Sequence, residues 1–146
     1  MNLSPKERAE RSAHEMWSDD RASEWFGMEL GTVDEGRAVV TLCVDERHVN
    51  GHDICHGGVI FALADSAFAF ACNSRNTRTV AFHNEITFLA PARLGDVLTA
   101  TAEEIDLSGR TGITDITVTK GDGSTIAQVR GVSRSIGGTL FDEQKV

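Results

Sequence analysis

The chain has 146 residues, only two prolines and a formal net charge of −8 at neutral pH. This length predicts a single domain over residues 1–146. The acidic balance, without a cluster of Lys and Arg, argues against nucleic acid as a partner, because phosphate binding needs a basic stripe. The charged N-terminus lacks the apolar segment of a signal peptide and no stretch is long enough to span a membrane, so we expect a cytoplasmic protein with no membrane partner.

The N-terminal part predicts a short helix followed by two strands. Ser4-Pro5 fits a helix N-cap followed by proline at the first helical position, and the helical pattern ends near Trp17. We therefore expect residues 1–20 to form an N-terminal helical extension. The turn signal Asp34-Glu35-Gly36 then separates two predicted strands, over residues 29–36 and 37–45.

The centre and the C-terminal half predict one helix and a sheet. Residues 57–73 are apolar on every helical face, so this helix must be buried. Four later segments alternate apolar and polar residues between turn signals: 79–90, 96–106, 112–119 and 124–133. We expect an α+β fold in which a curved antiparallel sheet of five to six strands wraps one long buried helix. Residues 137–146 are expected to form a flexible tail.

Asp65 is the only carboxylate in the apolar helix. Burial of a carboxylate is costly unless it is paired or neutralised. One interpretation is a structural Asp that hydrogen-bonds a loop. The residues at the start of the helix favour a functional role for Asp65. His56-Gly57-Gly58 opens the helix, where backbone N–H groups without acceptors can bind an anion or an oxyanion.

The histidines of the preceding loop suggest a metal site as an alternative. His48, His52 and His56 recur every four residues, with Asp53 and Cys55 nearby. Gly51 indicates a loop and no H-E-x-x-H or C-x-x-C pattern is present, so we expect neither a metal nor any other cofactor. The cysteines are interpreted as reduced thiols packed as small hydrophobic residues: Cys43, Cys55 and Cys72.

The segment from Asn50 to Ser74, with His56-Gly57-Gly58 and Asp65, resembles the signature of hotdog-fold acyl-CoA thioesterases. It is most similar to the PaaI-type thioesterases of phenylacetic acid degradation. The likeness continues through residues 86–100 and 130–138. It implies a hotdog subunit, a homodimer with one continuous sheet, and commonly a dimer of dimers. It also implies hydrolysis of phenylacetyl-CoA or ring-hydroxylated phenylacetyl-CoA, with coenzyme A as part of the substrate.

The resemblance also implies residue roles. Asp65 matches the position that acts on the thioester, as general base toward water or as nucleophile, and the sequence leaves both routes open. Gly57 matches the glycine whose N–H binds the thioester oxygen, while Asn50 and His56 match residues that position the carbonyl group. Further substrate contacts are expected from Gly58, His83, Asn84, Arg110 and Arg134.

One position departs from the family pattern. Some related thioesterases carry a Ser on the strand after the helix that orients the attacking water, and Ala81 occupies that place here. In a regular strand, His83 would lie on the same face as Ala81 and could replace the hydroxyl group.

Helix geometry makes a further prediction. Eight residues at about 1.5 Å each separate Gly57 from Asp65 by about 12 Å, too far for both to contact one carbonyl group. Antiparallel pairing of two such helices would bring each Asp65 to the partner's helix start. We therefore expect active sites between the two subunits of a dimer.

Two other functions fit parts of the pattern. A hotdog dehydratase would act on an acyl thioester with a His and an acid, as His56 and Asp65 could. A non-catalytic acyl-CoA-binding module is the second alternative, although it has no need of a buried carboxylate.

Overall fold

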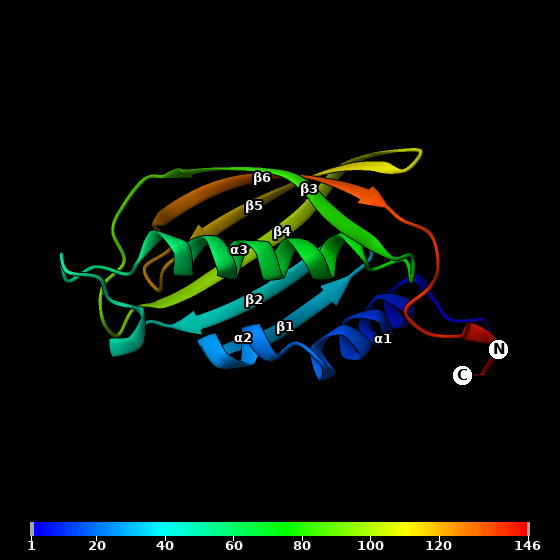
Figure 1. Ribbon diagram of the computed structural model, residues 1–146, viewed down its shortest axis with the longest axis horizontal. Helices are drawn as coiled ribbons and strands as arrows, with labels where there is room; N and C mark the ends of the chain where they lie inside the picture. Colours follow the sequence, from blue (N-terminus) through cyan, green and yellow to red (C-terminus); the bar gives the residue numbers. More distant parts are fainter. Residues whose placement is uncertain (1, 146) are drawn as a thin grey trace.

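A computed structural model describes residues 2–145 and contains a six-stranded antiparallel sheet wrapped around one long helix, α3 (Gly57–Cys72) (Figure 1). The strands follow one another in the sheet in the order β1-β2-β4-β5-β6-β3. Their bounds are β1 (Met28–Asp34), β2 (Arg37–Cys43), β3 (Thr79–Phe88), β4 (Val97–Ser108), β5 (Thr111–Thr119) and β6 (Thr125–Ser135). The predicted α+β fold is confirmed.

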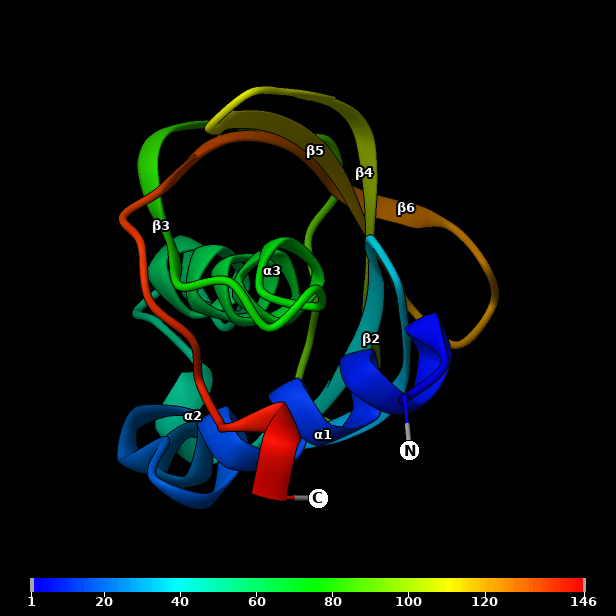
Figure 2. The same cartoon turned by 90° about the vertical axis from the view of Figure 1, so that its right-hand side faces the viewer.

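The core lies between α3 and the concave face of the sheet. Figure 2 shows the sheet as an arc around α3, with β3 on one side and β2 on the other. Leu63, Phe68 and Phe70 of α3 are fully buried. They belong to the same core as inward-facing residues of the strands: Val40, Leu42, Leu98, Ile116, Val118 and Ile126. The alternation of buried and exposed residues along β4 and β5 follows from this packing, as expected for a sheet with one buried face.

Two helices precede the sheet and lie below it in Figure 2. The predicted helix is α1 (Pro5–Ser18), which begins with a capping box between Ser4 and Glu7. The helix α2 (Arg21–Phe26) was not expected from the sequence. Asp20 caps its N-terminus and Gly27 ends it in the left-handed conformation. Because α2 contacts both β1 and α3, it brings the N-terminal segment close to the central helix.

β3 is an edge strand of the sheet, and no strand within residues 2–145 covers its outer edge. Three of its apolar side chains are largely exposed: Val80 at 45%, Phe82 at 62% and Phe88 at 52%. An exposed edge with large apolar side chains is a surface on which a second strand can pair. The opposite edge strand, β1, contacts α1 and α2.

Residues 137–145, for which a flexible tail was expected, lie against the loop that follows α3. The buried Asn76 side chain accepts hydrogen bonds from the backbone N–H groups of Leu140 and Phe141, and Arg8 of α1 pairs with Glu143 at 2.6 Å. The two ends of the described chain are therefore close together (Figure 1). None of the helices in residues 2–145 has the length and apolar character needed to cross a membrane.

Candidate active site

The N-terminus of α3 combines a capped turn with one free N–H group. His56 is the N-cap, and its Nδ1 accepts a hydrogen bond from the Gly58 N–H at 2.8 Å. A Cβ atom on residue 58 would lie 3.0 Å from this Nδ1, so glycine permits the close approach of the ring. The Gly57 N–H has no acceptor within residues 2–145. Gly57, rather than Gly58, therefore presents the donor at the positive end of the helix dipole.

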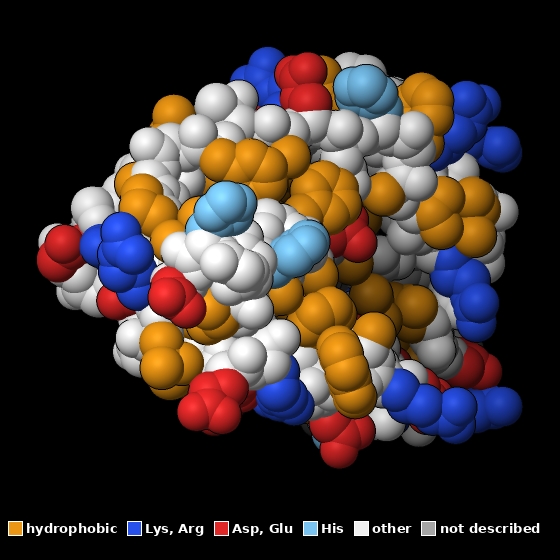
Figure 3. All heavy atoms as spheres, turned by 60° about the vertical axis from the view of Figure 1, so that its left-hand side comes forward, with side chains coloured by type: hydrophobic (Ala, Val, Ile, Leu, Met, Phe, Trp, Pro, Cys, Tyr) orange, Lys and Arg blue, Asp and Glu red, His pale blue; other side chains and the backbone are white. Residues whose placement is uncertain are grey.

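Gly57 and Asn50 line one hollow of about 350 Å³. The Asn50 Oδ1 accepts hydrogen bonds from the backbone N–H groups of His52 and Ile54, which leaves its NH₂ group as the end that can donate to a ligand. Other lining residues are mostly apolar: Ile54, Cys55, Ile60, Phe88, Leu89, Ala90 and Pro91. Figure 3, which brings this end of the molecule forward, shows a recessed surface with many hydrophobic side chains. Two donors beside an apolar hollow suit a carbonyl oxygen that becomes negatively charged.

Asp65 lies two turns further along α3 and is half-buried. Its Oδ1 accepts a hydrogen bond from the Asn84 Nδ2 of β3 at 3.1 Å. Burial raises the pKa of the Asp65 carboxyl group above its ordinary value, and the Asn84 hydrogen bond opposes that rise. A carboxylate with a raised pKa is better suited to accept a proton from water than an ordinary exposed Asp.

A second hollow, of about 220 Å³, lies on the α2 side of Asp65. Its apolar lining residues come from α2, β1 and α3: Ala22, Phe26, Met28, Ala62 and Ala69. Its polar lining residues are Asp65, Asp20, Ser23 and Ser66. Sequence reasoning missed the contribution of α2. The available signal was Asp20 three residues before Ser23, a typical N-cap pattern.

The polar residues of this hollow form a directed chain of hydrogen bonds. The Ser23 hydroxyl donates to Asp20 Oδ2 at 2.7 Å, and the Ser23 and Ser66 oxygens are 2.8 Å apart. Because Ser23 has one hydroxyl proton and donates it to Asp20 Oδ2, Ser66 is the donor to Ser23. The Ser66 oxygen then has free lone pairs but no proton to offer a ligand.

The two hollows share no residue, since Gly57 and Asn50 line one and Asp65 lines the other. This separation agrees with the helix-length argument. Within one chain, the Gly57 and Asn50 donors and the Asp65 carboxylate do not line a common hollow.

β3 is not a regular strand, although the predicted replacement of the hydroxyl group by His83 depended on one. Its pairing with β6 shifts register between Ala81 and His83, which leaves Phe82 as the extra residue of a β-bulge. Beyond the bulge, Asn84 contacts Asp65 and Phe88 lies against Gly57, so these alternate residues face α3. His83 therefore points to the outer face of the sheet, away from Asp65.

Arg110 and Arg134 are exposed neighbours at one end of the sheet. Arg134 pairs in register with Thr111, the residue after Arg110, and the Arg110 carbonyl accepts from the Ser135 N–H. Within the described chain neither guanidinium group has a salt-bridge partner. Both can therefore bind an anionic group.

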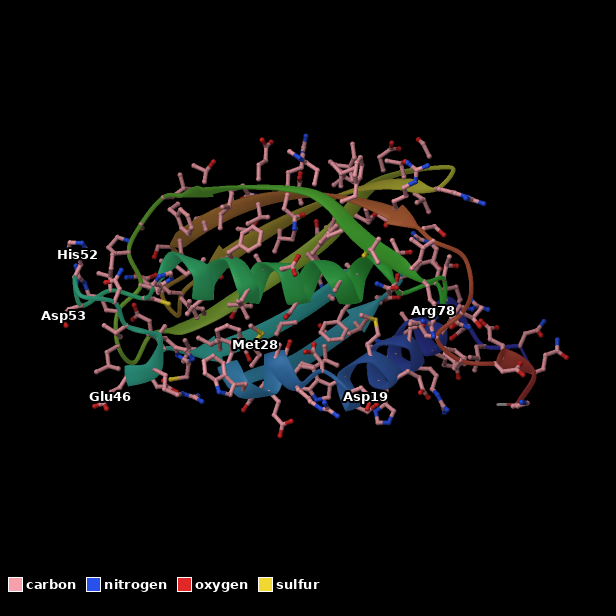
Figure 4. The ribbon with its side chains drawn as sticks, viewed as in Figure 1. Asp19, Met28, Glu46, His52, Asp53 and Arg78 are labelled. Atoms are coloured by element: carbon pink, nitrogen blue, oxygen red, sulfur yellow. The ribbon has the colours of Figure 1, made fainter. Side chains whose placement is uncertain are left out.

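The histidines of the loop before α3 have separate environments. His48 is buried, with Nε2 2.7 Å from the Phe26 carbonyl oxygen and Nδ1 accepting from the Asp45 N–H, so this ring helps to anchor the end of α2. His52 and Asp53 lie at the exposed tip of the loop (Figure 4). No group of three or more potential metal-binding side chains occurs among residues 2–145.

Cys55, which lines the hollow at Gly57, is a poor candidate for a nucleophile. Burial raises the pKa of its thiol to about 11, so the thiolate is scarce at neutral pH. Asp65 is then the candidate reactive group.

The fold and these groups match known proteins. Residues 52–127 match the family model described as "Thioesterase superfamily". The chain belongs to this superfamily, and it is a thioester hydrolase.

Among its relatives, the chain is 43% identical to the acyl-coenzyme A thioesterase PaaI of Escherichia coli over 136 residues, 93% of this chain and 97% of that protein. The solved structure of the E. coli PaaI protein superimposes with a TM-score of 0.92, covering 93% of this chain and 99% of that one. Human acyl-coenzyme A thioesterase 13 is 32% identical over 65% of this chain and 70% of that protein. A protein of Streptococcus pneumoniae described as a hypothetical thioesterase, and solved with coenzyme A, is 25% identical, with a TM-score of 0.74 over 77% of this chain and 90% of that one.

Proposed function

We propose that this chain hydrolyses phenylacetyl-CoA, or its ring-hydroxylated derivatives, to the free acid and coenzyme A in cytoplasmic phenylacetate catabolism. The similar E. coli protein is named acyl-coenzyme A thioesterase PaaI, and its structure is described as coming from the phenylacetic acid degradation operon. The S. pneumoniae thioesterase was solved with coenzyme A, which supports a coenzyme A thioester as substrate.

The hollow between α2 and α3 is the observation that carries the choice of acyl group. Phe26 and Met28 supply apolar surface for a ring directly beside Asp65. Besides Asp65, the polar groups Ser66 and Asp20 line this hollow and can accept hydrogen bonds. A ring that carries a hydroxyl donor satisfies these acceptors better than an aliphatic chain does.

The proposed reaction uses few groups. The Gly57 N–H and the Asn50 NH₂ bind the thioester oxygen as it becomes negatively charged. Asp65 either removes a proton from the attacking water or attacks the carbonyl carbon to form a mixed anhydride that water then hydrolyses. In both routes the C–S bond breaks and coenzyme A leaves as a thiolate, which needs little help from an acid. Exposed Arg110 and Arg134 are proposed to bind the coenzyme A phosphates.

We further propose a homodimer in which β3 pairs with the β3 of a partner, and dimers then associate in pairs. Along β3, Asn84 contacts Asp65 and Phe88 contacts Gly57. The four residue steps from Asn84 to Phe88 span about 13 Å, close to the 12 Å between Gly57 and Asp65 on α3. A pairing centred on Ile86 would therefore bring Asp65 level with the partner's Gly57 and complete the site.

The substrate proposal is tested by measuring kcat/KM for a series of coenzyme A thioesters. We expect phenylacetyl-CoA and hydroxyphenylacetyl-CoA to exceed both acetyl-CoA and palmitoyl-CoA. In Ser66→Ala, the ratio of hydroxylated to unsubstituted phenylacetyl-CoA should fall by about 3- to 10-fold, the effect of one hydrogen bond. A preference for palmitoyl-CoA in the wild-type protein would refute the aryl substrate, and an unchanged ratio would remove Ser66 from recognition.

A further inference from the structure

Asn84 is the one polar side chain from outside α3 that donates a hydrogen bond to Asp65 within the described residues. The bond joins Asn84 Nδ2 and Asp65 Oδ1 at 3.1 Å. It leaves Asp65 Oδ2 as the oxygen that can meet water or a carbonyl carbon. The orientation of the amide follows from charge, because a flipped amide would set its oxygen against the carboxylate.

Two features of the sheet place the Asn84 amide against the Asp65 carboxylate. The bulge at Phe82 shifts the register of β3, so that Asn84 faces α3 although it would lie on the opposite face from Ala81 in a regular strand. Gly131 of β6 is directly opposite Asn84 and provides the space for its amide. A Cβ atom on residue 131 would lie 2.8 Å from both Asn84 Oδ1 and the buried Phe68 ring.

The carbonyl end of the Asn84 amide makes no hydrogen bond of its own. Oδ1 is buried and has no donor within residues 2–145. An unsatisfied buried oxygen is unfavourable, and an apolar side chain at this position would avoid it. The hydrogen bond to Asp65 therefore accounts for a polar side chain at this position.

We propose that Asn84 is a positioning residue for catalysis: it holds Asp65 Oδ1 and thereby directs Oδ2 toward the reacting atoms. This inference rests on the proposed function, in which Asp65 is the reactive carboxylate.

The Asn84 hydrogen bond also favours the ionised form of Asp65. Burial raises the pKa of the Asp65 carboxyl group and the Asn84 N–H lowers it. Other titratable groups near Asp65 are Asp20 at the start of α2 and Cys72 on α3, whereas β1 presents the neutral Met28. Loss of the Asn84 donor should therefore raise the pKa of Asp65 further.

The test compares Asn84→Ala and Asn84→Asp with the wild-type protein across pH. Asn84→Ala removes the donor, and Asn84→Asp keeps the shape but replaces the NH₂ group with a second carboxylate. For both we expect kcat to fall by about 10- to 100-fold with little change in KM, as for loss of one hydrogen bond to a charged group. The acidic limb of kcat/KM should move to higher pH in both. Glu85→Gln is the matched control, since it removes a charge from the outer face of β3 and should leave this limb in place.

A folded Asn84→Ala with an unmoved acidic limb and kcat within about twofold of wild type would overturn the positioning role. Asp65→Asn separates this failure from that of the proposed function. If Asp65→Asn is inactive while Asn84→Ala behaves like wild type, only the role of Asn84 is lost. If Asp65→Asn stays active, the proposed site itself is wrong.

Discussion

Asp65 owes its chemistry to two opposing surroundings. The apolar helix and the core around it disfavour charge on the carboxylate, while the Asn84 N–H favours it. The result is a carboxyl group with a raised pKa that lines a hollow of about 220 Å³. A raised pKa makes the carboxylate a stronger base toward water than that of an ordinary exposed Asp.

Replacement of Asp65 by Asn should lower kcat by about 10² to 10⁴ fold, because the shape is kept and only the base or nucleophile is lost. Release of free thiol from phenylacetyl-CoA measures the effect, and thermal unfolding shows whether the variant is folded. In the wild-type protein, the acidic limb of kcat/KM should lie above pH 3.8, the ordinary pKa of an Asp side chain. Near wild-type turnover in folded Asp65→Asn would contradict the assignment.

Among the elements, β3 connects the chemistry to assembly. One face of this strand carries Asn84 and Phe88 toward α3, and its outer edge is uncovered within residues 2–145. In the proposed dimer, the same strand therefore holds the carboxylate and pairs with a second copy of the chain. The bulge at Phe82 determines which residues of β3 face inward beyond it.

Cysteines placed on the outer face of β3 test the pairing centred on Ile86. In that register, residue 85 lies beside residue 87 of the partner. In a Cys43→Ser background, which removes the exposed native thiol, Glu85→Cys and Thr87→Cys should each fail to cross-link alone. After chain exchange, the mixture should form disulfide-linked dimers on mild oxidation, seen on a non-reducing gel. Cross-linking of Glu85→Cys alone would indicate a different register, and no cross-linking would argue against β3 as the interface.

In the whole molecule, the proposed oxyanion donors and the Asp65 carboxylate lie in two hollows that share no residue. Two inactive variants should therefore complement each other in a mixed dimer. Gly57 is the first residue of α3, where the helix backbone accepts proline, although the Phe88 ring, 3.0 Å from a Cβ at this position, must shift slightly. Gly57→Pro removes the N–H donor, and Asp65→Ala removes the carboxylate. Refolding the two together should restore about a quarter of wild-type activity, because about half the dimers are mixed and each has one intact site.

Each variant refolded alone serves as the control for complementation. Chain exchange is checked by mass spectrometry of the native dimer. If the exchanged mixture stays inactive, Gly57 and Asp65 act within one chain.

The proposed reaction also makes a prediction about metals. Backbone and amide N–H groups with a carboxylate suffice for it, so prolonged dialysis against a chelator should leave turnover unchanged. Activity that is lost on chelation and returns only with zinc would instead support the metal interpretation of the histidine loop.

The amino-acid sequence was sufficient to predict α1, α3 and all six strands, because hydrophobic periodicity and turn residues are local properties. It also singled out Asp65 and Gly57, since one charge on an apolar helix and glycines at its start are visible in the linear pattern. The distance between them followed from helix geometry. The short α2 was missed because six residues carry too little periodicity to be recognised.

The contacts that complete the site depend on packing between segments far apart in the chain. Asn84 meets Asp65 across 19 residues, and Ser23 meets Ser66 across 43. A single extra residue in the bulge of β3 determines that Asn84, and not His83, faces the carboxylate. Side chains alternate between the faces of a strand, so a register shift of one residue exchanges them, and strand register arises from pairing with β6 and not from the local sequence.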